Sequence, residues 1–153
     1  MFAGYFKHAS QKMALSSTVT SKKDTIVFNS GYFVVERINP VVSKSSNTYI
    51  SNAEVSFRFL KVNKYLSDNK MPLKLFFGQK SYFWIPLEGL AGKPMFILPP
   101  NEQVEIELSY PSLISGEVDI EVSFEFEGYY VTADNFRIDG SGLNKALVYA
   151  LID

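Results

Sequence analysis

Hydrophobic and polar residues alternate with a period of two along most of the chain between residues 25 and 131, and this pattern predicts half-buried β-strands. The alternation is clearest in residues 104–110 and 118–127, where apolar side chains occupy one parity and acidic residues or serines the other. Each of these two strands should have one face in a core and one in water. Further strands are predicted at residues 25–28, 32–38, 54–59, 73–77, 82–85 and 95–98.

Turn residues separate the predicted strands, as in Asn29-Ser30-Gly31 and Pro99-Pro100-Asn101. After Phe59 the apolar phase slips by one residue, which predicts a bulge near Leu60 or Lys61. Eight or so short strands without helical stretches between them favour an all-β fold. We expect an antiparallel β-sandwich, either jelly-roll or immunoglobulin-like, with short arms or helices at its ends.

The two ends of the chain depart from strict alternation. Apolar residues near the N-terminus and in residues 143–151 recur at near-helical spacing, which predicts two short amphipathic helices. The joint Gly140-Ser141-Gly142 gives the second segment freedom to move. We therefore divide the chain into an N-terminal arm (1–24), a β-sandwich domain (25–139) and a C-terminal apolar segment (140–153), and expect both ends to contact neighbouring molecules. The N-terminal apolar positions are Phe2, Tyr5, Phe6, Ala9 and Met13.

Length and composition suit one globular domain. A chain of 153 residues can bury a core without covalent staples, and the absence of cysteine excludes a disulfide framework, a thiolate zinc site and a cysteine nucleophile. No apolar run reaches the ~18 residues that a membrane-spanning helix needs. The first residues lack a basic segment followed by an apolar core, so we expect no secretory signal.

Charge is divided unevenly along the chain. Residues 1–93 contain 13 basic and five acidic residues, a balance of +8, whereas residues 94–153 contain two basic and 11 acidic residues, a balance of −9. Two interpretations remain open. Acidic and basic strands could pair within one sandwich, or a bipolar surface could join copies head to tail.

The residues that usually carry catalysis are scarce. His8 is the only histidine and is expected to be solvated in a terminal arm, which leaves little for a catalytic triad or a histidine metal site. No phosphate-binding glycine loop occurs. The acidic residues of the two clearest strands lie on the expected wet parity, where nothing raises a pKa for acid catalysis. We therefore expect no enzyme and no cofactor.

Two weaker ligand possibilities remain. Asp134, Asn135 and Asp139 are oxygen donors close in sequence, but they do not match an EF-hand calcium loop. The lysines of the first 24 residues could contact phosphates without reading a nucleic-acid sequence, because no recognition motif accompanies them. These lysines are Lys7, Lys12, Lys22 and Lys23.

Some predicted strands are apolar on both faces, notably Tyr82-Phe83-Trp84-Ile85 and Met95-Phe96-Ile97-Leu98. One face can enter the core, and the other needs cover. That cover can come from the chain's own loops and ends, or from neighbouring copies or a partner. A third alternative is a platform for stacking sugars, formed by Tyr82, Trp84, Tyr129 and Tyr130.

The chain combines a lysine-bearing N-terminal arm, an apolar C-terminal segment and strands separated by proline- and asparagine-containing turns, as in Ile97-Leu98-Pro99-Pro100-Asn101-Glu102. In this combination it resembles the small β-sandwich or jelly-roll structural proteins of bacteriophage virions. The resemblance implies a non-enzymatic component of a capsid, vertex or tail that binds copies of itself or other virion proteins. It also implies location in the virion, with a cytoplasmic or extracellular location as the alternative. The competing function is a carbohydrate- or surface-binding module. Candidate interaction residues are Phe2, Tyr5, Phe6, Tyr82, Trp84, Leu143, Leu147 and Leu151.

Overall fold

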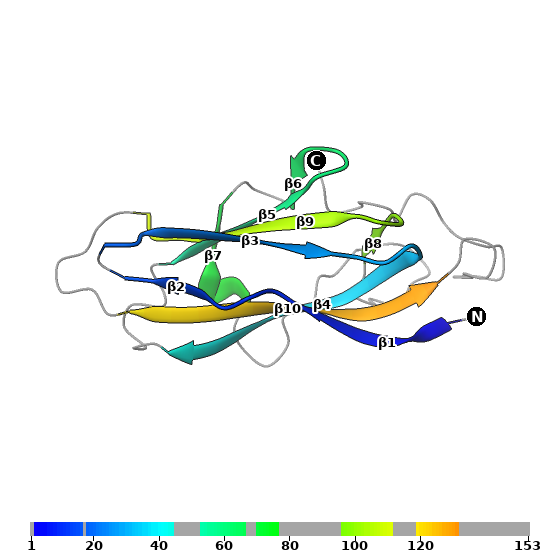
Figure 1. The fold of residues 1–153 in the computed structure, drawn as a ribbon, viewed down its shortest axis with the longest axis horizontal. Coiled ribbons are helices and arrows are strands. Elements are labelled where there is room, and N and C mark those ends of the chain that lie inside the picture. The colour runs from blue at the N-terminus through cyan, green and yellow to red at the C-terminus, as the bar shows by residue number, and fades with distance from the viewer. Residues whose placement is uncertain are drawn as a thin grey trace.

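A computed structural model describes residues 2–16, 18–44, 53–66, 70–76, 96–111 and 119–131, which form two antiparallel β-sheets packed face to face (Figure 1). This arrangement confirms the all-β sandwich expected from the alternation. The first sheet contains β1 (Phe2–Ala9), β2 (Met13–Leu15), β10 (Ile120–Val131), β4 (Tyr32–Lys44) and β8 (Phe96–Leu98). The second contains β3 (Ser21–Val27), β9 (Gln103–Ser109), β5 (Glu54–Phe59), β6 (Lys64–Tyr65) and β7 (Met71–Pro72).

The order of the strands is that of a jelly roll. β1 and β2 lie end to end along β10, and β6 and β7 lie end to end along β5, so each pair counts as one interrupted strand. The eight resulting strands then follow the order 1-8-3-6 in the first sheet and 2-7-4-5 in the second. This is a long antiparallel hairpin rolled up on itself, since strand 1 pairs with 8, 2 with 7, 3 with 6 and 4 with 5. An immunoglobulin domain instead orders its strands ABED and CFG.

The core lies between the two sheets, where the inward faces of the central strands β9 and β10 meet the other strands. The predicted inward positions Phe57, Ile106, Ile120, Val122 and Phe124 are all fully buried, which confirms the phase of these strands. The ring of Phe57, on β5, packs edge-on against Phe124 and Phe126 of β10 at centroid distances of 5.4 and 5.5 Å. Aromatic pairs in this geometry contribute beyond their buried area.

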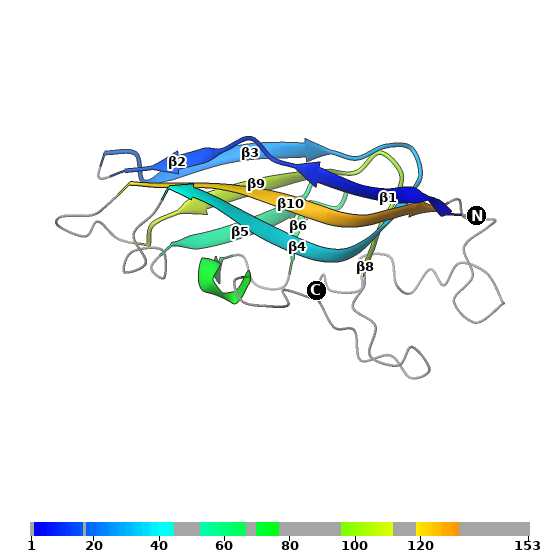
Figure 2. The same cartoon turned by 90° about the horizontal axis from the view of Figure 1, so that it is seen from below.

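The prediction of an N-terminal helix is wrong for the described residues. Residues 2–9 form β1, an edge strand of the first sheet, and Figure 2 shows it beside β10. At Ser10 the strand is interrupted, and the side-chain hydroxyl and backbone N–H of Ser10 both bond to the backbone of Phe124. Inward positions change from even numbers before this break to odd numbers after it, at Met13 and Leu15. Of the apolar residues that gave the near-helical spacing, Met13 is buried, whereas Phe6 and Ala9 are exposed.

Two local predictions in the second half of the sandwich are also corrected. The slip after Phe59 is a tight turn over residues 60–63 rather than a bulge, and Asn63 takes a left-handed φ of 52° that asparagine tolerates. Leu73–Phe76 is a 3₁₀ helix, η1, where a strand was expected. Its three-residue turn places Leu73 and Phe76 on the same side, and both are buried.

Apolar residues on both faces of β4 and β8 are covered within one copy of the chain. The neighbouring residues Val34 and Val35 point to opposite faces of the sheet, as do Ile97 and Leu98, and all four are fully buried. For this part of the sheet the chain's own residues supply the cover, so no partner is needed there. The similar segment 82–85 lies outside the described residues.

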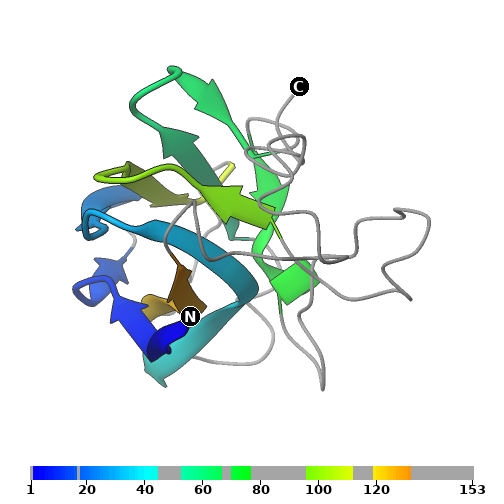
Figure 3. The ribbon, with the colours of Figure 1, turned by 90° about the vertical axis from the view of Figure 1, so that its right-hand side faces the viewer.

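Residues assigned to the N-terminal arm pair with the sheets of the sandwich. Viewed from its end, the sandwich has β1, β2 and β3 along one side and η1 toward the other (Figure 3). β1, β2 and the start of β3 are therefore integral strands. The predicted C-terminal helix, residues 143–151, lies outside the described part of the chain. No helix within the described residues is long and apolar enough to cross a membrane.

Candidate interaction surface

Opposite charges from the two halves of the sequence meet on the outer faces of both sheets. β10 and β9 carry the acidic residues and occupy central positions, and the strands beside them carry the lysines and arginines. Each of the seven ion pairs in the described part of the chain joins a basic residue before position 94 to an acidic residue after it. The uneven charge of the sequence is thus explained by cross-strand pairing within one sandwich.

Glu127 has the parity predicted for it, but its side chain is buried rather than solvated. Its side chain is only 5% exposed, and its carboxylate lies 2.6 Å from Nε of Arg37 and 3.4 Å from Nζ of Lys7. The Arg37 contact is an ion pair without hydrogen-bond alignment, because neither Arg37 Nε nor Glu127 Oε2 has a well-directed hydrogen bond. Residues on both flanking strands therefore converge on this carboxylate. A buried charge of this kind is expected to be paired, and the pair here is structural.

The acidic residues of β9 make a looser network. Glu105 lies 3.2 Å from Arg58 and 3.9 Å from Lys23, and Glu107 also lies 3.9 Å from Lys23. On β10, Glu121 pairs with Lys12. Three of the four N-terminal lysines considered for phosphate contact, Lys7, Lys12 and Lys23, therefore have carboxylate neighbours within the same molecule. This pairing lowers the positive charge that the N-terminal strands present to a nucleic acid.

His8 also differs from its predicted place in a solvated arm. It lies on β1 with its ring half-buried against Phe28, at a centroid distance of 4.8 Å, and against Phe33, at 5.2 Å. Its Nε2 is 2.6 Å from the hydroxyl of Tyr130. Burial lowers the pKa of His8. The reason for the error is that β1 pairs with β10, which turns the side chain of His8 toward the core.

The proposed sugar platform is divided by the sheet. Tyr130 is buried and points into the sandwich, where its hydroxyl accepts a hydrogen bond of 2.8 Å from the backbone N–H of Asn29. Tyr129, its neighbour, points to the opposite face. Burial raises the pKa of both tyrosines, and the charge of Glu36 adds to the effect at Tyr129. These two rings do not form a common stacking surface.

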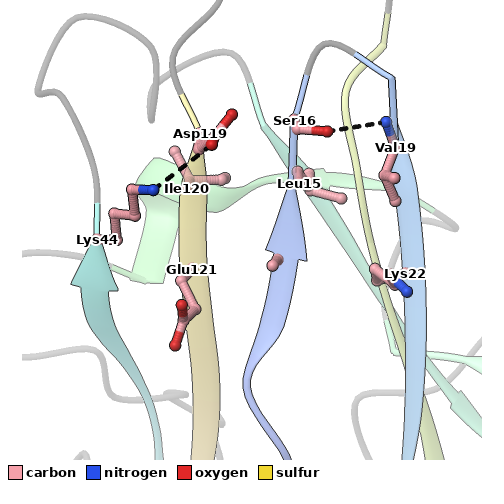
Figure 4. Close-up of a pocket in the computed structure, with 9 residues that line it drawn as sticks. Leu15, Ser16, Val19, Lys22, Lys44, Asp119, Ile120 and Glu121 are labelled. Carbon is pink, nitrogen blue, oxygen red and sulfur yellow. Dashed lines mark hydrogen bonds and ion pairs between the residues drawn. The ribbon is translucent and has the colours of Figure 1, made fainter.

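A shallow cleft of about 210 Å³ opens at the end of the sandwich where β2, β3, β4 and β10 meet (Figure 4). Its lining contains both apolar and charged side chains. Lys44 pairs with Asp119 at 3.5 Å, and the hydroxyl of Ser16 accepts a 3.0 Å hydrogen bond from the N–H of Val19. The cleft is lined by Ala14, Leu15, Ser16, Val19, Lys22, Lys44, Asp119, Ile120 and Glu121.

The predicted interaction residues are only partly within the described chain. Phe6 is 39% exposed and packs edge-on against Tyr130 at 5.3 Å, so it forms the outer margin of the aromatic cluster around His8. Phe2 and Tyr5 lie on β1, opposite Val131 and Tyr129 of β10. The remaining candidates, Tyr82, Trp84, Leu143, Leu147 and Leu151, lie outside the described residues.

Glu102 was not selected from the sequence. Glu102 is fully buried, and its Oε1 accepts hydrogen bonds from the backbone N–H of Lys61, at 3.2 Å, and of Gln103, at 2.8 Å. Its backbone carbonyl accepts a further bond from the N–H of Phe28. This one residue ties together the turns after β5, β8 and β3. An acid directly after the Pro-Pro-Asn turn was the only available signal, and that position is compatible with many surface turns.

Comparison with known proteins gives no further guide. No model of a known protein family matches the chain, and neither does any curated protein or solved structure.

Proposed function

We propose that this chain is a non-enzymatic structural protein of a virion, placed in a capsid, vertex or tail, and that it works by binding neighbouring copies of itself or other virion proteins. The observation that carries the proposal is the strand order 1-8-3-6 and 2-7-4-5. Viral capsid proteins are among the main users of this jelly-roll order. A fold hosts many functions, so the proposal also needs support from individual residues.

The support from individual residues is that the carboxylates and the histidine, which an enzyme could use in catalysis, form contacts within the sandwich. The carboxylate of Glu127 is buried between two cations, Glu105 and Glu107 pair across strands, and His8 is packed among aromatic rings. These groups stabilise the sandwich. Apolar residues at Phe6 and in the stripe of the C-terminal segment are then the candidates for contact with a neighbour.

Light scattering coupled to size-exclusion chromatography tests the proposal on the purified full chain. We expect a mass above that of one chain, rising with protein concentration. Leu147→Asp places a charge in the apolar stripe and should lower the mass toward 17.3 kDa without changing the melting temperature. Asn144→Asp is the matched control, because it adds the same charge outside the stripe.

A monomer at every concentration, alone and when mixed with particle proteins of its source, would contradict the assembly role. Jelly-roll domains also occur in lectins, so binding to a glycan array by such a monomer would instead establish the competing carbohydrate-binding function.

A further inference from the structure

His8 sits where the edge strand β1 meets the core. Its ring contacts Phe28 from the loop after β3, Phe33 from β4 and Tyr130 from β10, with centroid distances of 4.8, 5.2 and 5.5 Å. Phe6, two residues earlier on β1, stacks beside it at 6.3 Å. One side chain of β1 therefore joins that strand to three other parts of the sandwich.

The hydrogen bonds around Tyr130 favour a neutral His8. The hydroxyl oxygen accepts a bond from the N–H of Asn29, which can only donate. When Nε2 of His8, 2.6 Å away, carries no proton, the hydroxyl donates its own proton to it. When Nε2 is protonated, the hydroxyl oxygen can accept from it with a second lone pair, but the hydroxyl proton then loses this acceptor, so the arrangement favours a neutral imidazole with its proton on Nδ1.

Within the described residues, no carboxylate forms an ion pair with His8 that would offset a positive charge. Tyr130 is the titratable side chain that faces the ring, and burial raises its pKa, so it remains neutral. Lys7 and Glu127 pair with each other, and they and Glu125 belong to the opposite parity of β1 and β10. The carboxylate of Glu102, near Phe28, accepts bonds from two backbone N–H groups. The lowered pKa of His8 has burial as its cause.

We propose that His8 is a pH-operated latch, which holds β1 on the sandwich while its imidazole is neutral and releases the strand when the imidazole is protonated. Protonation removes the acceptor of the Tyr130 hydroxyl proton and places a positive charge against Phe28 and Phe33. In the described part of the chain, β1 is hydrogen-bonded to β10 alone. The strand can therefore detach while the other pairings remain.

The direction of the pH effect follows from the lowered pKa. A released or unfolded His8 binds a proton near its ordinary pKa of about 6.5, and the docked residue binds one only at lower pH. β1 is therefore held on the sandwich above about pH 6.5, and its attachment weakens as the pH falls below that ordinary histidine pKa. Aspartate and glutamate ordinarily titrate near pH 4, and His8 is the only histidine, so it is the one side chain whose ordinary pKa lies between about pH 5 and 7.5. The inference does not depend on the assembly role.

Hydrogen exchange measured by mass spectrometry tests the latch on the full chain. After correction for the intrinsic pH dependence of exchange, peptides from residues 2–9 should exchange faster at pH 5 than at pH 7.5. Peptides from β5 and β9 should keep their protection. His8→Phe keeps an aromatic ring in the cluster but cannot titrate, so in this variant the pH dependence of β1 should disappear.

A second measurement keeps the test independent of how well the variant folds. In the wild-type protein, the single histidine resonance should titrate in an NMR experiment with a pKa below 6.5. Three results would overturn the proposal: a histidine pKa at or above that value, equal β1 protection at both pH values, or an equal loss of protection in β1, β5 and β9.

Discussion

The two central strands, β9 and β10, have the same alternating pattern in sequence but treat their acidic residues differently. On β9, Glu105 and Glu107 keep 24% and 27% of their side-chain surface and pair with cations at 3.2–3.9 Å. On β10, only 5% of the side-chain surface of Glu127 is exposed. Alternation correctly predicts which face each side chain takes, but the depth of that side chain depends on what the flanking strands place over it.

The difference on β10 arises from a shift in register beside Glu127. Glu127 pairs with Arg37, but the next residue, Gly128, pairs with Val35, so Glu36 is an extra residue on β4. At Gly128 the two backbones approach so closely that a Cβ would lie 1.8 Å from the carbonyl oxygen of Val34. The bulge and the glycine bring Arg37 over Glu127. No register shift is found between β9 and its neighbours β3 and β5.

Replacement of Gly128 should have the largest effect on stability among the substitutions that test the difference between β9 and β10. The methyl group of Gly128→Ala would collide with the backbone of Val34, and either β4 or β10 must move. We expect a loss of about 3 kcal/mol or more in the free energy of unfolding, at the upper end of the usual cost of overpacking. Urea denaturation measures it. Ser123→Ala on the same strand is the control and should change stability by less than about 0.5 kcal/mol. Equal stabilities would mean that the close approach is absent.

Two matched carboxylate substitutions compare the contribution to stability of a buried charge on β10 with that of a partly exposed charge on β9. Glu127→Gln removes the charge that Arg37 and Lys7 share and should cost about 1.5–3 kcal/mol, as for hydrogen bonds and contacts to buried charged groups. Glu107→Gln removes a looser, solvent-screened pair and should cost less than about 1 kcal/mol. Chemical denaturation at low and high salt compares them. A larger cost at Glu107 would contradict the role of burial.

The smallest effect is expected for Glu121→Gln, at the other end of β10. Glu121 lies 3.6 Å from the exposed ammonium group of Lys12, a surface pair that is screened by solvent. We expect a change of no more than about 0.5 kcal/mol in stability and no change in oligomeric mass. Loss of a measurable biological activity with the fold intact would instead point to a catalytic carboxylate.

The parts of the site that could be predicted are those governed by local pattern. The buried faces of β9 and β10 followed from period-2 alternation, because a half-buried strand must alternate. The left-handed Asn101, with φ of 60°, lies in the turn expected after Pro99-Pro100. The His8 contact could not be predicted in this way, since its partner Tyr130 is 122 residues away and β1 had no clear alternation of its own.

The sequence by itself determined the fold class, the phase of the central strands and the separation of positive from negative charge along the chain. Those properties depend on residue type and short-range spacing, which can be read directly. Tertiary structure alone decided that the sandwich is a jelly roll, that residues 2–9 form a strand, that Glu127 is buried and that His8 is half-buried. Each of these depends on which strands become neighbours. That choice is made by burial and backbone pairing over long sequence separations, and such pairing overrides local spacing.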